Sequence, residues 1–250
     1  MKQLIEKFKM YGFNKFVLYS FVEIKRFIVM ILIKGSYSQQ GEDLIIDKLL
    51  GYKKSGFYVD VGANNPNHFS NTKRFYKKGW RGINIEPDLN NFQKFKDQRK
   101  RDINLNCGIA TTNSKLTFYK FFPDTLSTFS KSEANKYKKQ GYKLQEKKDV
   151  EVQPLSDVLS QYCKKGNIDF FSVDTEGFDL DVLKSNDWNK FKPKLICIES
   201  VSHDLNNINN KKKDDHELFL CNVGYKKIYD NGLNSIFAKN LERVSWIKSF

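Results

Sequence analysis

Short runs of β-branched and aromatic residues alternate along the chain with segments whose apolar residues recur at helical spacing. FYVDV (57–61) is typical of a buried strand, and GEDLIIDKLL (41–50) is typical of a helix that ends before Gly51. The pattern predicts further helices over residues 70–79, 88–96, 154–163, 180–185 and 215–222. It predicts further strands over residues 82–86, 103–109, 115–121, 169–174 and 194–200. Such alternation indicates an α/β fold, with a doubly wound, mostly parallel sheet.

Two segments break this alternation. The last apolar runs, 224–230 and 234–240, flank the dipeptide Asn231-Gly232, which is a hairpin signal. The sheet is therefore expected to end in a C-terminal antiparallel hairpin. Residues 124–148 are polar and rich in lysine, and they are expected to form an irregular loop or a lid.

The first 36 residues are expected to form an N-terminal helical appendage ahead of a domain over residues 37–250. Their longest charge-free runs, 16–22 and 27–33, hold only seven residues each, whereas a membrane span needs about twenty apolar residues. No small-residue cleavage site follows an uninterrupted apolar core, so a signal peptide is not expected either. Two interpretations stay open: helices packed on the domain, or helices lying on an anionic membrane surface or a partner.

Composition narrows the class of protein. Hydrophobic residues make up 40% of the chain, which excludes a disordered protein. Part of the net charge of +14 lies in the runs 94–101, 136–143 and 211–213. We interpret these runs as a solvated surface; the alternative is that they attract an anionic partner. The four cysteines lack C-x-x-C spacing, so we expect buried thiols in a reducing cytoplasm and no metal held by cysteine.

The turn after the first predicted strand departs from the dinucleotide-binding fingerprint. In GFYVDVGANNPNH (56–68), Asn64 and Asn67 stand where the second and third glycines of G-x-G-x-x-G would be. Asp60, just before the turn, would repel a pyrophosphate and attract a sulfonium or ammonium group. S-adenosylmethionine has a ribose, no phosphate and a cationic amino-acid end, so it is the predicted cofactor.

Acids gather at the predicted strand ends, where ligands of doubly wound sheets bind. The residues expected along this rim are Asp60, Gly62, Glu86, Asp174 and Glu199. Glu86 closes the second strand, where a nucleoside-binding sheet places the carboxylate that takes both ribose hydroxyls.

Five motifs in order resemble the FkbM family of S-adenosylmethionine-dependent methyltransferases. They are YSQQGED (37–43), GFYVDVGANNPNHFSNT (56–72), GWRGINIEP (79–87), VEVQPLSDVL (150–159) and FFSVDTEGFDLDVLKS (171–186). The resemblance runs from Tyr37 to Asn240 and leaves the appendage outside. It implies a class I methyltransferase (Rossmann-like) sheet of seven strands with the last antiparallel. It also implies O-methyl transfer, commonly to sugars of glycans, glycolipids or related metabolites.

The same resemblance implies positions for the cofactor. Asp60, Gly62 and Asn64 would lie along its methionine side, and Glu86 would hold the ribose. Cys107, Gly108 and Ile109, after the third strand, would lie near the adenine. The Asn65-Pro66 pair departs from the glycine that is commoner in the family, which leaves the contacts at the methionine end open.

Methyl transfer to a hydroxyl needs alignment and a base. His203 is the first candidate because an unperturbed imidazole has a pKa of about 6.5, although it is equally interpreted as a plain loop histidine. Asp174 and Glu176 in DTEG are further catalytic candidates, and DTEG, through Asp174, is also expected to shape the cofactor pocket. A divalent metal that bridges Asp174 and a neighbouring acid to a sugar diol is an alternative that is not expected.

Gln39 and Glu42 have no evident role in a core, and we expect them to contact the cofactor or the substrate. A helix cap explains Ser38 or Asp43.

Three other classes of protein compete with this interpretation. Nucleic acid is an unfavoured partner. Amino-group methylation of bases is disfavoured because the chain has DTEG, and no N/D-P-P-aromatic stretch, after the fourth strand of the class I sheet. Cytosine C5 methylation is disfavoured because none of the four cysteines follows a proline, whereas RNA ribose O-methylation stays open. A nicotinamide dehydrogenase is disfavoured by the glycine turn. A non-catalytic basic protein that binds membranes or glycans is the third alternative. The expected location is cytoplasmic, with peripheral membrane contact through residues 1–36 as the open alternative.

Overall fold

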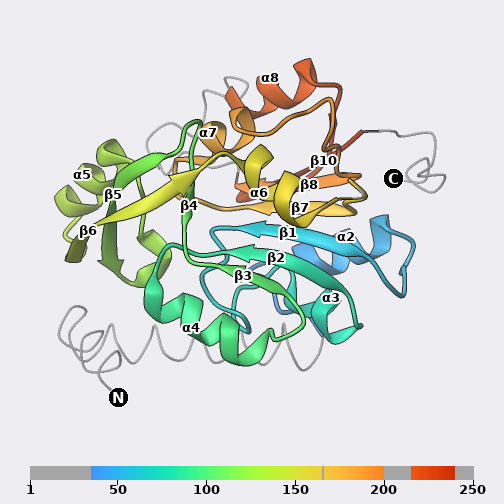
Figure 1. Ribbon diagram of the computed structural model, residues 1–250, viewed down its shortest axis with the longest axis horizontal. Helices are drawn as coiled ribbons and strands as arrows, with labels where there is room; N and C mark the ends of the chain where they lie inside the picture. The colour runs from blue at the N-terminus through green and yellow to red at the C-terminus, as the bar shows by residue number, and fades with distance from the viewer. Residues whose placement is uncertain (1–34, 165, 200–214, 240–250) are drawn as a thin grey trace.

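The computed structural model describes residues 35–164, 166–199 and 215–239 (Figure 1). The predicted appendage over residues 1–36 lies outside them except for its last two residues, so its membrane or partner contact stays a prediction. The helices are α2 (Glu42–Leu49), α3 (Lys73–Lys77), α4 (Leu89–Gln98), η2 (Asp124–Leu126), α5 (Lys131–Lys139), α6 (Leu155–Tyr162), α7 (Asp179–Lys184) and α8 (Asp215–Asn222). The strands are β1 (Phe57–Val61), β2 (Arg81–Ile85), β3 (Ile103–Leu105), β4 (Gly108–Ile109), β5 (Ser114–Phe122), β6 (Lys143–Gln153), β7 (Phe170–Val173), β8 (Leu195–Glu199), β9 (Lys226–Asp230) and β10 (Asn234–Ala238).

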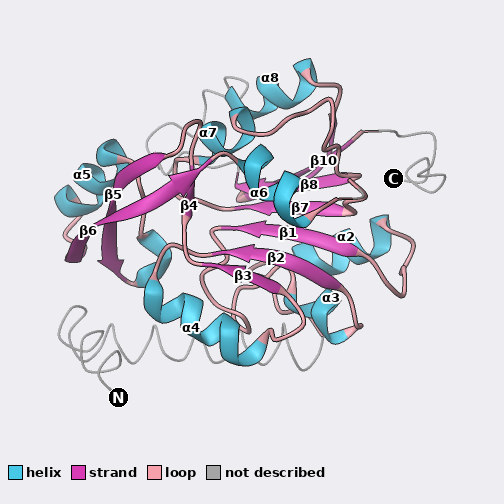
Figure 2. Cartoon of the chain, viewed as in Figure 1, coloured by secondary structure: helices cyan, strands magenta, loops and turns pink. Residues whose placement is uncertain are grey.

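A seven-stranded sheet organises the domain, in the order β3-β2-β1-β7-β8-β10-β9 (Figure 2). The pairs β2–β3, β1–β2, β1–β7 and β7–β8 are parallel. β10 lies between β8 and β9 and runs antiparallel to both. The α/β class, the mostly parallel sheet and the C-terminal antiparallel hairpin are therefore confirmed. Chain order reverses between β1 and β7, which makes that crevice the switch point of the sheet.

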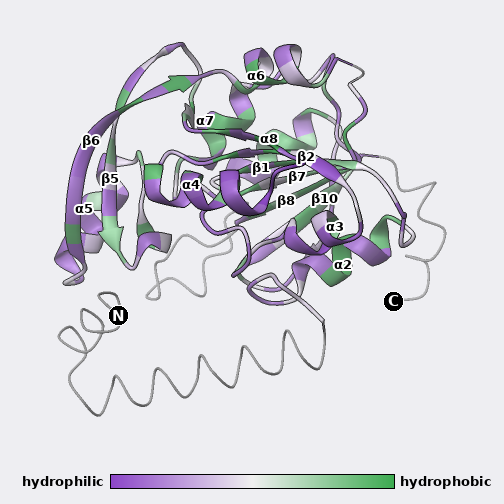
Figure 3. Ribbon diagram, turned by 60° about the horizontal axis from the view of Figure 1, so that its bottom comes forward, coloured by the Kyte–Doolittle hydropathy of each residue, from purple (hydrophilic) through white to green (hydrophobic). Residues whose placement is uncertain are grey.

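Helices cover both faces of this sheet because its central strands are apolar on both sides. On one face, Val59 and Phe171 pack with the buried residues Leu159 of α6, Leu183 of α7 and Leu220 of α8. On the other face, the partners of the sheet are Ile46 of α2, Phe75 of α3 and Trp80. Figure 3 shows hydrophobic residues concentrated in the central strands, whereas β6 and α5 are largely hydrophilic.

A second, three-stranded sheet interrupts the alternation, with the order β4-β6-β5. We call the segment from β4 through β6, residues 108–153, the insertion; it projects to one side of the domain (Figure 1). The predicted strand over residues 103–109 is split, because β3 pairs with β2 while β4 pairs with β6. The prediction of an irregular loop over 124–148 is wrong: this segment holds η2, α5 and most of β6.

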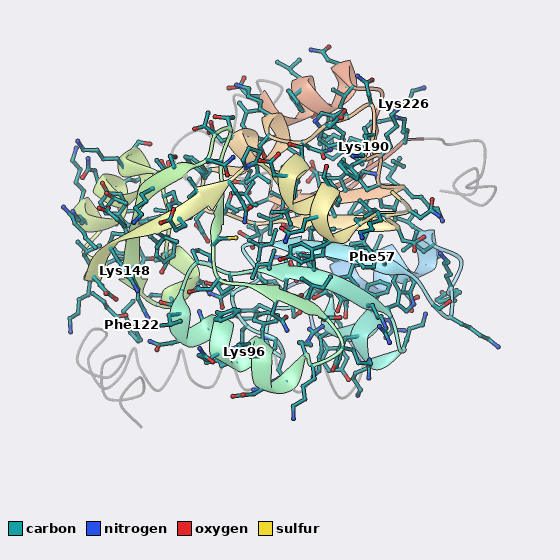
Figure 4. All side chains as sticks on the ribbon, in the orientation of Figure 1. Phe57, Lys96, Phe122, Lys148, Lys190 and Lys226 are labelled. Atoms are coloured by element: carbon teal, nitrogen blue, oxygen red, sulfur yellow. The ribbon has the colours of Figure 1, made fainter. Side chains whose placement is uncertain are left out.

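The lysines are spread over the domain. Figure 4 labels exposed lysines on separate parts of the chain: Lys96 on α4, Lys148 on β6, Lys190 after α7 and Lys226 on β9. This distribution fits a solvated surface. Within residues 35–164, 166–199 and 215–239, no helix combines the length and apolar character needed to cross a membrane.

Candidate active site

One cavity of about 330 Å³ lies at the carboxyl ends of the parallel strands. The predicted site residues among its lining are Gln39, Asp60, Gly62, Asn64, Glu86, Cys107, Gly108, Ile109, Asp174 and Glu176. His203 lies outside the described residues, so its position stays a prediction. Apart from Glu42, the cavity therefore brings together the predicted catalytic and cofactor-binding residues that the structure describes.

The turn after β1 is tight. The backbone N–H groups of Gly62 and Ala63 both donate to the Ile85 carbonyl at 3.1 Å. Gly62 has φ +77°, and a Cβ atom there would lie 1.8 Å from the carbonyl oxygen of Asp174. Asn64 follows in the left-handed region with φ 48°, a conformation that asparagine adopts more readily than most residues. Glycine is thus needed at 62 because the backbone of Asp174, just after β7, passes directly beside it.

Glu86, immediately after β2, is 4% exposed and accepts two backbone hydrogen bonds. The Asn64 N–H donates to Oε2 at 2.6 Å, and the Asp88 N–H donates to Oε1 at 2.7 Å. Burial raises the pKa of Glu86 to about 8, although both backbone donors oppose that rise. A carboxylate has about four acceptor positions, so about two remain for a ligand, and Glu86 lines the cavity.

Asp60 is 5% exposed, and its Oδ2 accepts a hydrogen bond from the Thr72 hydroxyl at 2.7 Å. Burial raises the pKa of Asp60, while the Thr72 hydrogen bond and the charge of Arg99 oppose the rise. Thr72 stands at the start of α3, so this bond joins the strand before the turn to the helix after it.

Arg99 was missed by the sequence analysis, which places it in a solvated run. It is fully buried beneath the turn. Its Nε and Nη2 donate to the Pro66 carbonyl at 3.1 and 2.7 Å, and its Nη1 donates to the Tyr58 hydroxyl at 3.1 Å. Tyr58 in turn donates to Asp102 at 2.5 Å. The buried guanidinium thus stabilises the turn at Asn65-Pro66, where the chain departs from the glycine pattern. This contact is long-range, so no local sequence pattern reveals it.

The segment between β3 and β4 carries Cys107, which is 7% exposed. Burial raises the pKa of its thiol, and the Gln153 side-chain amide, 3.4 Å from the sulfur, opposes the rise. A Cβ atom at Gly108 would lie 2.5 Å from the ring of Phe129. Residues 107–109 are therefore buried and closely packed, as a wall for a flat ring would be.

Three carboxylates meet at the ends of β7 and β8. Asp174 and Glu176 follow β7, and Glu199 ends β8. One oxygen of each lies within 4.8 Å of the others. Burial in the cavity raises the pKa of all three. The charge of Asp174 adds to the rise at Glu176 and Glu199, whereas Asp179 and Asp60 add to the rise at Asp174. These raised pKa values favour a partly protonated acid cluster, which can both accept and donate hydrogen bonds. The same oxygens suit a divalent cation.

Gln39 lines the cavity as predicted, but Glu42 does not. The Glu42 carboxylate accepts from the Gln40 N–H at 2.8 Å and from the Asn231 and Asn234 amides at 2.8 Å each. Burial raises the pKa of Glu42, yet hydrogen bonds from the Gln40 N–H, its own N–H and the side chains of Asn231 and Ser38 outweigh it, and the pKa is lowered. The predicted contact of Glu42 with a ligand is wrong; it ties α2 to the β9–β10 hairpin.

Aromatic residues of the cavity also escaped the sequence analysis. The rings of Phe118 and Phe129 lie 5.0 Å apart, and those of Phe129 and Phe178 lie 5.9 Å apart. Phe178 lies two residues after Glu176, whereas Phe118 and Phe129 belong to the insertion. The aromatic wall depends on a fold of residues 108–153 that the sequence did not indicate.

Comparison of the sequence with models of known protein families finds a match to one family. The model of the methyltransferase FkbM domain matches residues 60–227. A solved structure that resembles this one is the crystal structure of Burkholderia thailandensis 1,6-didemethyltoxoflavin-N1-methyltransferase with bound 1,6-didemethyltoxoflavin and S-adenosylhomocysteine. The two chains share 9% sequence identity at a TM-score of 0.38, over 80% of this chain and 75% of that chain. No match is found among curated proteins.

Proposed function

The chain belongs to the FkbM methyltransferase family, and from this premise we propose that it is an O-methyltransferase that uses S-adenosylmethionine to methylate a hydroxyl of a sugar. The acceptor sugar would belong to a glycan, a glycolipid or a related metabolite. The observation that carries the proposal is the pairing, in one cavity, of the acid cluster with the rings of Phe129 and Phe178. Carboxylates bind sugar hydroxyls, and aromatic faces pack on the apolar face of a sugar ring.

The cofactor end of the cavity fits S-adenosylmethionine. Glu86 keeps two acceptor positions beside the turn, which suits a ribose diol. Asp60 and Asp174 provide negative charge, which suits a sulfonium and an ammonium and opposes a pyrophosphate. Gly62, Asn64 and Gln39 would line the methionine end, and residues 107–109 would pack on the adenine.

The residues of the chain would then have defined roles. When bound, S-adenosylmethionine supplies an activated methyl group on sulfur. The acid cluster would orient the acceptor hydroxyl, and most of the rate would come from this alignment, because effective molarities of about 10⁵ M or more are available from positioning. The proton of the hydroxyl would pass to a base as the new oxygen–carbon bond forms. Asp174 and Glu176 are candidates for this base, and His203, four residues beyond Glu199, stays the first candidate from the sequence.

The test has two steps. Calorimetry should show that S-adenosylhomocysteine binds to the protein, and absence of binding would remove the methyl-transfer proposal. The protein should next be incubated with methyl-labelled S-adenosylmethionine and separate glycan, glycolipid and RNA fractions. We expect label in a sugar-containing fraction. Label in RNA alone would replace the sugar acceptor with RNA ribose.

A further inference from the structure

The insertion contacts Glu176 from two directions. The hydroxyl of Tyr137, a 1% exposed residue of α5, donates to Glu176 Oε2 at 2.5 Å. The hydroxyl of Thr128, which precedes α5, donates to the Glu176 backbone carbonyl at 2.8 Å. Glu176 itself belongs to the segment that follows β7 of the main sheet. Two residues of the insertion thus hold both the side chain and the backbone of one residue of the acid cluster.

This residue has an unfavourable backbone conformation. Glu176 has φ 53°, in the left-handed region that costs most L-residues about 1 kcal/mol or more. Gly177 follows with φ +86°, and a Cβ atom there would lie 2.7 Å from Cγ of Glu133 in α5. Such a conformation persists only where surrounding contacts enforce it. Here Thr128, Tyr137 and the close approach of α5 restrain Glu176 from the side of the insertion. From the other side, Asp179 of α7 accepts the Thr175 N–H at 2.9 Å and the Gly177 N–H at 3.2 Å.

The enforced conformation has an electrostatic result. It brings the Glu176 carboxylate to within 4.8 Å of those of Asp174 and Glu199, where like charges oppose one another. Asp179 and Glu133 add further negative charge from α7 and α5. A neutral donor, the Tyr137 hydroxyl, stabilises the ionised form of Glu176. The insertion thus supplies the hydrogen bond that holds the Glu176 side chain among these charges.

We infer that Tyr137 and Thr128 are positioning residues of the methyl transfer, which act through Glu176 to keep the acid cluster aligned for the acceptor hydroxyl. The insertion is then part of the catalytic machinery, and not only a cover over the cavity. The inference rests on the proposed function for its kinetic consequence. Its structural basis, the coupling of Tyr137 to Glu176, is measurable without any acceptor.

The first test measures that coupling. Protein labelled with ¹³C at the glutamate carboxyl carbons is titrated by NMR as wild type, Tyr137→Phe and Tyr142→Phe. Tyr142 is the matched control, because its ring packs on Tyr137 at 6.1 Å within the same small cluster. Loss of the Tyr137 donor should raise the pKa of Glu176, since the hydrogen bond favours the ionised form. The Tyr142→Phe titration should match that of wild type.

The second test measures function. Tyr137→Phe should bind S-adenosylhomocysteine within about twofold of wild type and should lower kcat by about 10- to 100-fold on the acceptor found in the labelling screen. Its pH–rate profile should shift in the same direction as the NMR titration. Thr128→Val is the second variant: it removes the hydrogen bond to the Glu176 carbonyl and also the acceptor of the Ser130 N–H at the start of α5. It should also lower kcat while sparing cofactor binding.

The outcomes separate the two proposals. If wild type does not bind S-adenosylhomocysteine, the proposed function fails, whereas the NMR comparison still reports on Tyr137 and Glu176. If Tyr137→Phe titrates as wild type does, or if it keeps the wild-type kcat and pH profile, the positioning role is overturned. A loss of cofactor binding equal to the loss of kcat would also overturn it, because that result indicates a general structural role.

Discussion

The backbone N–H of Asn64 donates to Oε2 of Glu86 at 2.6 Å, and this bond joins the turn after β1 to the end of β2. The Asp88 N–H holds the other carboxylate oxygen at 2.7 Å. Glu86 is therefore fixed in orientation before any ligand binds. A fixed carboxylate loses little conformational entropy on binding, so Glu86 should contribute strongly to affinity.

Glu86→Gln should weaken S-adenosylhomocysteine binding by about 10- to 100-fold, because charge-assisted hydrogen bonds are about twice as strong as neutral ones. One of the two backbone donors would also face the amide NH₂ group of the new side chain. Calorimetry measures the change in Kd. Glu151→Gln is the control, since the Glu151 side chain is 70% exposed on β6; an equal loss of affinity there would contradict the assignment.

The affinity for S-adenosylhomocysteine should rise with pH. Burial raises the pKa of Glu86 to about 8, so the free protein carries a neutral Glu86 below that pH. Ribose hydroxyl donors favour the ionised form, and binding should therefore release a proton below about pH 8 and none above it. Calorimetry in buffers of different ionisation enthalpy counts the protons. Glu86→Gln should show a flatter pH dependence; identical curves would assign the proton to another group.

Gly62→Ala should destabilise the protein and abolish cofactor binding. The new Cβ atom would combine a left-handed φ with a position 1.8 Å from the Asp174 carbonyl oxygen. Gly141→Ala is the matched control, because Gly141 has φ +86° but a Cβ atom there would meet nothing within 4 Å beyond its chain neighbours. We expect a loss of about 1 kcal/mol in the free energy of unfolding at 141 and at least twice that at 62. Denaturant titrations of both variants test the difference.

The sequence predicts the parts of the site that depend on chain order. Asp60 is the last residue but one of β1 and Glu86 directly follows β2, and parallel strands bring such positions to one edge of the sheet. Asp60 and Glu86 could therefore be placed together from the pattern alone. The family resemblance added residues 107–109, which also line the cavity.

The parts that depend on long-range pairing could not be predicted in this way. β6 is exposed along most of its length, and its partner β5 lies too far away in the sequence for local periodicity to predict the pairing. Its lysines resemble those of a loop, so the insertion, Tyr137 and the aromatic wall were missed. Arg99 was missed for the same reason: its neighbours in the sequence are solvated, whereas its partners Pro66 and Tyr58 are 33 and 41 residues away.

Arg99→Lys should lower the free energy of unfolding by about 3 kcal/mol. A lysine cannot reproduce the guanidinium's hydrogen bonds to both the Pro66 carbonyl and the Tyr58 hydroxyl, and its buried charge would therefore be poorly paired. Arg101→Lys is the control: Arg101 is exposed and lies over the Tyr76 ring, as Arg99 also does. Denaturant unfolding should separate the two variants. Equal stability would mean that the guanidinium does not support the turn.

His203→Ala should lower kcat while leaving the Kd for S-adenosylhomocysteine unchanged. Glu199, at the end of β8, lines the cavity. His203 follows four residues later in the sequence and lies outside the described residues. If its imidazole takes the acceptor proton, the rate should fall below a pKa near 6.5 in wild type, and this acidic limb should disappear in the variant. His68→Ala, which removes an exposed imidazole near the turn, is the control. A His203→Ala enzyme with the wild-type kcat and acidic limb would assign the base to the acid cluster, where Asp174 has a pKa raised by burial to about 7.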